Sequence, residues 1–102
     1  MANIRHKFNA VRVEADNRKF ASKKECAYYQ ALKSRKQNGE VILFLWQTPF
    51  HSDCGVKYIV DFVEFRSDGT VHFIDVKGFP TETYKIKKKL IENEFQITIE
   101  EV

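Results

Sequence analysis

Cysteine is scarce in this chain, and long apolar runs are missing. The 102 residues include two cysteines, Cys26 and Cys54, which are too few and too far apart for a disulfide framework or a zinc site. No apolar run approaches the roughly 20 residues that span a membrane. The basic opening of the chain has no apolar stretch behind it, unlike a secretory signal. We therefore expect a cytoplasmic protein with free thiols and no membrane partner.

Glycine, proline and net charge are also low. Four glycines and two prolines leave no linker, so we expect residues 1–102 to form one domain, with residues 1–9 as a flexible basic arm. The net charge of +3 permits a nucleic-acid partner without requiring one. Apolar residues, by contrast, are plentiful: 43% of the chain is hydrophobic and 14% aromatic, which excludes a disordered protein and provides a core.

The chain is organised around residues 58–79, which are predicted to form a β-hairpin. Both halves are rich in Val, Ile, Phe and Tyr, and the Ser-Asp-Gly sequence at 67–69 is typical of a turn. If the hairpin is symmetric about Asp68, Asp61 lies directly opposite Asp75, and paired residues point to the same face. Lys77 follows two positions after Asp75 and shares that face.

Apolar residues fill both faces of this hairpin, which predicts central strands covered on both sides. One face is expected to carry Tyr58, Val60, Phe62, Ile74 and Val76, and the other Ile59, Val63, Phe65, Val71 and Phe73. Two carboxylates forced together there repel, and desolvation opposes ionising either one. A divalent cation relieves this, because Mg²⁺ binds through one or two carboxylates, water and substrate phosphate. The alternative is that both aspartates lie at strand ends in water.

Residues 22–39 predict a helix with a capping box. Ser22 and Glu25 fit the S-x-x-E pattern, in which each side chain binds a free backbone N–H, and Gly39 suits the position just after the last turn. Glu25 also begins the apolar stripe of the helix. It therefore has two compatible interpretations: a capping residue, and an acid that points from the buried face towards the sheet.

Two segments before the hairpin are predicted as strands. Residues 10–14 alternate as a short strand that returns over 18–20 after a turn at 15–17. Residues 41–50 are nearly all apolar, which predicts another central strand. Pro49 either ends that strand or places it at an edge.

A helix and a last strand are predicted after the hairpin. Thr81 or Thr83 caps the helix, and Ile86 and Leu90 are expected to face the sheet, with Tyr84 and Ile91 flanking them. Residues 95–101 alternate as the last strand. The predicted fold is therefore α/β, with an αβββαβ core: a mixed sheet of about four strands flanked by helices, after a short N-terminal hairpin.

The polar residues outline a site for phosphodiester hydrolysis. We expect Asp61, Asp75 and the carbonyl of Val76 to hold a hard divalent cation such as Mg²⁺, which polarises the scissile phosphate and lowers the pKa of a bound water. Lys77 is expected to orient that water or to stabilise the negative transition state. Glu25 is expected to reach a second metal, or the same one through water.

The order Glu25, Asp61, then Asp75-Val76-Lys77 on this arrangement resembles the PD-(D/E)XK nuclease superfamily. More closely, the runs SKKECAYYQALK, YIVDFVEF and IDVKGFPTETYKIKKKL resemble a small phage- and prophage-associated family, catalogued as a domain of unknown function. The resemblance covers roughly residues 7–102, with Val60 in place of the superfamily's nominal Pro. It implies a restriction-endonuclease-like fold and Mg²⁺- or Mn²⁺-dependent cleavage of DNA in a bacterial host.

Several polar residues are candidates for contact with nucleic acid. They are Lys23 and Lys85, to which the resemblance adds Gln47, Tyr84 and Lys88. These candidates also have structural interpretations without nucleic acid. Gln47 could simply be a polar residue at the end of a strand, and Tyr84 an aromatic residue of the core. The lysines of the second helix could form a solvated basic face.

We expect an endonuclease that is structure-selective or weakly specific, because no element is suited to base readout. The alternatives are a non-catalytic nucleic-acid-binding module and a phage interaction protein on the same fold. A domain this small offers little surface to enclose a duplex, so we expect a homodimer.

Overall fold

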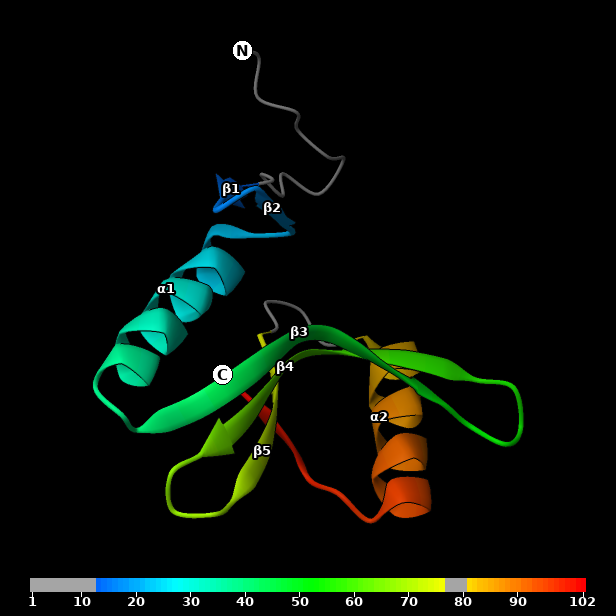
Figure 1. The fold of residues 1–102 in the computed structure, drawn as a ribbon. Helices are drawn as coiled ribbons and strands as arrows, with labels where there is room; N and C mark the ends of the chain where they lie inside the picture. The colour runs from blue at the N-terminus through cyan, green and yellow to red at the C-terminus, as the bar shows by residue number, and fades with distance from the viewer. Residues whose placement is uncertain (1–12, 77–80) are drawn as a thin grey trace.

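The chain folds as a four-stranded sheet between two helices, preceded by a small hairpin (Figure 1). The computed structural model describes residues 13–76 and 81–102. The elements, in order, are β1 (Val13–Ala15), β2 (Arg18–Phe20), α1 (Lys23–Gln37), β3 (Val41–His51), β4 (Lys57–Arg66), β5 (Val71–Asp75), α2 (Glu82–Phe95) and β6 (Ile99–Glu101).

The sheet is mixed, with strand order β3-β4-β5-β6. The first two pairs are antiparallel, whereas β5 and β6 are parallel and connected through α2. The predicted α/β class and αβββαβ order are confirmed. Within the described parts of the chain, neither helix is long and apolar enough to cross a membrane.

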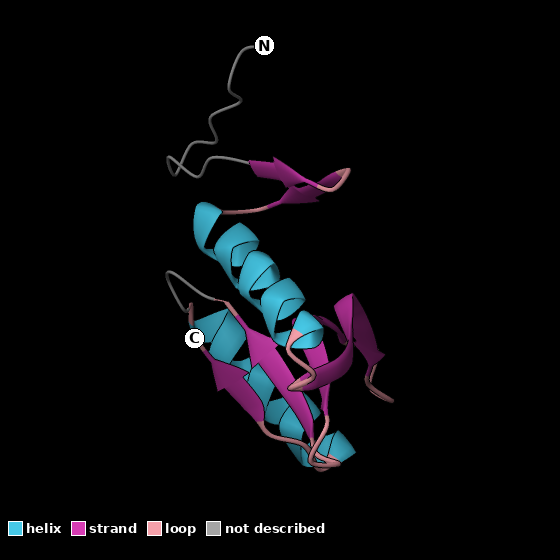
Figure 2. Cartoon of the chain, turned by 60° about the vertical axis from the view of Figure 1, so that its left-hand side comes forward, coloured by secondary structure: helices cyan, strands magenta, loops and turns pink. Residues whose placement is uncertain are grey.

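The N-terminal hairpin pairs β1 with β2 in antiparallel register, beyond the first turn of α1 (Figure 2). Asp16 and Asn17 form its turn with φ of 51° and 62°, the left-handed conformation that two-residue hairpin turns require. The predicted hairpin is confirmed from Val13 onward, and residues 10–12 and the basic arm at 1–9 lie outside the described residues.

Both ends of α1 are capped as predicted. The Ser22 side chain accepts a hydrogen bond from the Glu25 N–H, at 3.1 Å. At the other end, Gly39 has φ of 83° and its N–H donates to the Lys36 carbonyl, while the Glu40 N–H donates to the Arg35 carbonyl. This is the Schellman arrangement, in which glycine takes the left-handed position at little cost.

Two apolar clusters cover opposite faces of the sheet. On the α1 side, Leu32 packs with Phe62 and Ile74. On the α2 side, Ile91 packs with Val63. Because Phe62 and Val63 are neighbours in β4, their membership of different clusters follows from strand alternation.

The register of the β4-β5 hairpin is the predicted one. Phe65 pairs with Val71 and Phe62 with Ile74, so each pair is equidistant from Asp68. The Asp68 carboxylate accepts the Thr70 N–H at 2.9 Å and closes the turn. Strand β5 ends at Asp75, before the predicted limit.

Strand β3 lies at the edge of the sheet, so the prediction of a central strand is wrong. Its apolar run reflects incomplete coverage: Ile42, Leu43 and Leu45 are 61%, 42% and 45% exposed. The alternative prediction, that Pro49 places this strand at an edge, is correct. Proline has no backbone N–H to donate, and an edge strand needs hydrogen bonds on one side only.

Strand β4 changes face at Asp61. Val60 packs in the α2-side cluster with Val63, although strict alternation would place it with Phe62 on the α1 side. Tyr58 belongs to the α2 side as well. The predicted common face for Tyr58, Val60 and Phe62 is therefore wrong.

Strand β3 changes face at the same level, at Gln47. Trp46 packs in the α1-side cluster, whereas Phe50 packs in the α2-side cluster. Gln47 has φ of 55°, which is uncommon for a residue with a side chain and locally interrupts the alternation. The pairs Trp46–Phe62 and Thr48–Val60 flank Gln47 and place it opposite Asp61. Both strands therefore change face at the same level of the sheet.

The far end of the β3-β4 hairpin is attached to α2 through Glu94. Its carboxylate accepts hydrogen bonds from the Ser52 hydroxyl at 2.8 Å and from the Asp53 N–H at 3.0 Å. Both donors lie in the loop after β3, so this contact holds the loop against the helix.

The buried face of α2 is centred on the residues expected to flank it, and Ile86 does not belong to it. Thr81 is the N-cap and accepts the Tyr84 N–H, as predicted, but Ile86 is 68% exposed and Ile91 is fully buried. Tyr84 and Ile91 are two helical turns apart and face the sheet, which turns Ile86 to the solvent side. The helix also includes Phe95, which the sequence pattern places in the last strand, so β6 is shorter than predicted.

Candidate functional site

The carboxylates of Asp61 and Asp75 accept backbone hydrogen bonds across the two strands where the β4-β5 ladder stops. The last backbone pair is Phe62–Ile74, so the two aspartates would be the next pair in register. Instead, the Asp61 N–H donates to Oδ1 of Asp75 at 3.1 Å, and the Val76 N–H donates to Oδ2 of Asp61 at 2.8 Å. The strands thus remain joined at this point through the two carboxylates.

Two tyrosine hydroxyls meet the buried carboxylate of Asp75. The side chain of Asp75 has no exposed surface, and its Oδ2 accepts a hydrogen bond from the Tyr58 hydroxyl. The Tyr84 hydroxyl lies 3.3 Å from the same oxygen and 2.8 Å from Oε2 of Glu101 on β6. The two tyrosine rings stack with centroids 6.1 Å apart. Hydrogen bonds to an ionised carboxylate compensate for its burial.

Both tyrosines are held in the protonated, donating form. Burial, followed by the hydrogen bond to Asp75, raises the pKa of Tyr58 far above its ordinary value. Burial, followed by the hydrogen bond to Glu101, raises the pKa of Tyr84. Neither phenol therefore ionises in the physiological range.

Glu25 is buried at the head of α1, only 3% exposed, and each carboxylate oxygen has a partner. Oε1 accepts the Ala21 N–H at 3.3 Å, and Oε2 accepts the indole N–H of Trp46 on β3 at 3.2 Å. Both predicted geometries are present: Glu25 supports the N-terminus of the helix and points at the sheet. Its bond to Trp46 places it on the α1 side, whereas the bond from Tyr84 to Asp75 is on the α2 side.

The oxygen donors at the aspartates suit a hard divalent cation. Carboxylates and a backbone carbonyl are the ligands that Mg²⁺ and Mn²⁺ prefer, and Asp61, Asp75 and Val76 supply them within one short segment of two adjacent strands. Across residues 13–76 and 81–102, no three Asp, Glu, His or Cys side chains gather around one point, so Glu25 does not complete the pair. Lys77 lies outside the described residues.

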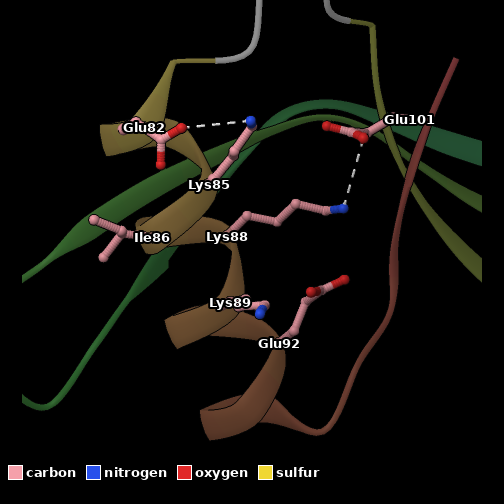
Figure 3. A pocket seen from close by; sticks show the side chains of 7 residues that line it. All are labelled: Glu82, Lys85, Ile86, Lys88, Lys89, Glu92 and Glu101. Carbon is pink, nitrogen blue, oxygen red and sulfur yellow. Dashed lines mark ion pairs between the residues drawn. The ribbon is translucent and has the colours of Figure 1, made fainter.

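The candidates for nucleic-acid contact are spread over three elements. Lys23 is exposed at the start of α1, and Gln47 is exposed on β3, opposite Asp61 in register. Tyr84 combines its two interpretations, with a ring packed in the core and a hydroxyl at Asp75. Lys85 and Lys88 line a cavity on α2 and are paired with carboxylates, as Figure 3 shows.

Sequence reasoning missed the role of Tyr58. Alternation alone places Tyr58 and Asp61 on opposite faces, and therefore separates Tyr58 from Asp75. The change of face at Asp61 brings the Tyr58 hydroxyl to Asp75. A positive φ at a glutamine within an apolar strand leaves no mark in the sequence pattern, so no available signal identified this contact.

A comparison with protein families finds one match over nearly the whole chain. The model of the family described as "Protein of unknown function (DUF1064)" matches residues 5–100. Neither the search of curated proteins nor that of solved structures finds a match.

Proposed function

The chain belongs to the DUF1064 family, and from that starting point we propose that it is a metal-dependent DNA endonuclease of the PD-(D/E)XK type. The site would hydrolyse phosphodiester bonds with Mg²⁺ or Mn²⁺ at Asp61 and Asp75. The order of Glu25, the two aspartates and Lys77 along an αβββαβ fold supports this assignment.

The observation that carries the proposal is the pair of hydrogen bonds in which the Asp75 carboxylate accepts from Asp61 and the Asp61 carboxylate accepts from Val76. A sheet normally continues with backbone hydrogen bonds, and here two carboxylates replace one step of the ladder between interior strands. Asp75 is fully buried and Asp61 half-buried beside it, and such an arrangement of two acids costs free energy unless their charges are compensated. A cation-binding role accounts for that arrangement, whereas an apolar pair at this position would suffice for stability alone.

Each residue has a separable task in the proposed reaction. Asp61 and Asp75 provide the oxygen ligands, with the Val76 carbonyl as a third. Tyr58 and Tyr84 orient the Asp75 carboxylate through their hydroxyls. When bound, the metal would polarise the scissile phosphate and lower the pKa of its water. Lys77, two positions after Asp75 in the sequence, would stabilise the charge that develops on the phosphate.

A cleavage assay tests the proposal directly. The parent, Asp75→Asn and Asp61→Asn are offered supercoiled plasmid, single strands and a four-way junction, each with Mg²⁺, Mn²⁺ or EDTA. We expect metal-dependent cutting by the parent and a loss of at least about a hundredfold in either variant, because each removes charge from the metal site. Asp53→Asn, in the exposed loop after β3, is the matched control and should cut like the parent.

Two outcomes would reject the nuclease. Equal cutting by Asp75→Asn and the parent would show that the activity belongs elsewhere. Metal-independent DNA binding with no cutting by any protein would favour the non-catalytic binding module. Circular dichroism of each variant establishes that the fold is intact.

The oligomeric state and the substrate form stay predictions. A homodimer would allow both strands of a duplex to be cut. Light scattering at micromolar concentration distinguishes a dimer from a 12.0 kDa monomer. The preferred substrate in the cleavage assay distinguishes structure-selective from duplex cutting.

A further inference from the structure

Two cavities on the described surface differ in their charge. The cavity on α2, of about 480 Å³, is lined by three lysines and three glutamates together with Ile86 (Figure 3). Lys85 is 3.5 Å from a Glu82 oxygen, and Lys88 is 3.9 Å from a Glu101 oxygen. The acids therefore balance the bases there, which weakens the attraction of this face for a polyanion.

The second cavity, of about 340 Å³, lies between α1, β2 and β3 and has cationic walls. Its lining consists of Arg18, Tyr29, Lys33, Lys36, Gln37 and Phe44, with three basic side chains and no acidic one. The bases come from two elements, Arg18 from β2 and the lysines from the second half of α1.

Of these three cations, only Lys33 forms an ion pair with a described acid, Asp16, and the charge of Arg18 also acts on that carboxylate. Arg18 itself lies over aromatic rings, with its guanidinium carbon 5.2 Å from the Tyr29 ring centre and 5.3 Å from that of Trp46. Among the described residues, no carboxylate lies within ion-pair distance of Arg18 or Lys36. The cavity keeps a positive charge that an anion can neutralise.

The cationic cavity adjoins the level of the candidate site along β3. Phe44 lines the cavity, and Gln47, three residues later, lies opposite Asp61. At about 3.3 Å per strand residue, this separation is about 10 Å. The cavity lies on the α1 side of the sheet, whereas the Asp75 carboxylate meets Tyr84 on the α2 side, so a backbone that contacts both must pass around β3, the edge strand.

We propose that the cavity formed by Arg18, Lys33 and Lys36 binds phosphodiester groups of the DNA backbone on the α1 side of the sheet, at a distance from the scissile bond. This inference rests on the proposed function and adds a substrate-binding surface on α1 and β2 to it. Arginine and lysine in such a cavity neutralise phosphates, and because they read no bases they position the substrate without conferring sequence specificity.

The test measures DNA binding in EDTA, so that it does not depend on cleavage. The affinity of a fluorescent oligonucleotide duplex is determined over a series of salt concentrations for the parent, Lys36→Gln and Arg18→Gln. For each phosphate that a variant no longer neutralises, the slope of log K against log salt should become shallower by about 0.9. Lys57→Gln, an exposed lysine at the start of β4, removes the same charge elsewhere and should leave the slope unchanged.

Several results would overturn the inference. An unchanged slope for Lys36→Gln would overturn it, and so would an equal decrease in slope for Lys57→Gln. The Lys36 side chain is exposed, so its replacement should not disturb the fold. Displacement of the duplex by inorganic phosphate at constant ionic strength would indicate a small-anion site, and absence of DNA binding would remove the inference altogether. If the variants change the salt dependence of DNA binding as expected but the parent does not cut DNA, only the proposed nuclease activity is rejected.

Discussion

The Tyr58 hydroxyl on β4 donates a hydrogen bond to Oδ2 of Asp75, the last residue of β5. Asp75 is fully buried, so this oxygen cannot exchange its partner for bulk water. The orientation of the candidate metal ligand is therefore set by a phenol from the neighbouring strand, which makes Tyr58 a positioning residue for the proposed site.

Replacing Tyr58 should weaken metal binding without removing a ligand. In Tyr58→Phe, Asp75 loses a hydroxyl donor, and we expect the affinity for Mn²⁺ to fall by about 10-fold or more. Tyr84→Phe should have a smaller effect, because the Tyr84 hydroxyl is 3.3 Å from Asp75 and is shared with Glu101. Calorimetric titration measures both affinities.

The matched control for these variants is Tyr29→Phe. It removes the hydroxyl of another buried tyrosine, whose partner is Asp16 rather than Asp75. Equal metal affinity in the parent and Tyr58→Phe would exclude the positioning role.

Glu25→Gln should lower stability through the end of α1. The Gln amide cannot accept from both the Ala21 N–H and the Trp46 indole as a carboxylate does, so one donor loses its partner. We expect a loss of about 2 kcal/mol in the free energy of unfolding, measured with urea. An unchanged unfolding midpoint would contradict this role, and a loss of cleavage in fully folded protein would add a catalytic one.

The buried Glu64 should make stability depend on pH on the acid side. Burial opposes its charge, but hydrogen bonds from Tyr28, Arg35 and Arg66 outweigh burial and lower the pKa of Glu64. A lowered folded-state pKa contributes stability above the unfolded value of about 4.3, and this contribution is lost as pH falls through the folded pKa.

A glutamine at this position provides the comparison. Glu64→Gln should be less stable than the parent by roughly 3 kcal/mol at pH 7, because two arginines lose their buried acid. The difference should narrow below about pH 4. Urea unfolding at several pH values checks both points, and a constant difference across that range would be inconsistent with the assignment.

The phase of α2 can be tested with two isoleucines of the same helix. Ile91 is fully buried, so Ile91→Ala should cost about 2–5 kcal/mol by leaving a cavity. Ile86 is 68% exposed, so Ile86→Ala should change stability by less than about 0.5 kcal/mol. Thermal unfolding of both variants measures the contrast, and the reverse order would restore the face predicted from the sequence.

Local signals predicted the order of elements well. The capping residue Ser22, the glycine at 39 and the turn at Asp68 each have one physical role that short-range geometry determines. The hairpin register followed from symmetry about Asp68 and brought Asp61 and Asp75 together.

The failures have separate causes, of which the first is that apolar composition does not report whether a strand is covered on both faces. The residues of β3 are apolar although the strand lies at an edge with Leu43 and Leu45 exposed. The face change at Gln47 depends on a backbone angle, and so the contact of Tyr58 with Asp75 could not be derived from periodicity. The ion pairs of Lys85 with Glu82 and of Lys88 with Glu101 depend on how the side chains are placed in the folded protein, which the sequence pattern does not contain.

The change of face in β4 has a consequence for the cooperativity of unfolding. Because Val60 and Phe62 of one strand pack in opposite clusters, neither cluster can lose that strand while the other keeps it. The loop after β3 is also held to α2 by Glu94. The two helices therefore share a structural support and should melt together in one transition, with no stable half-folded species in which α1 or α2 remains docked alone.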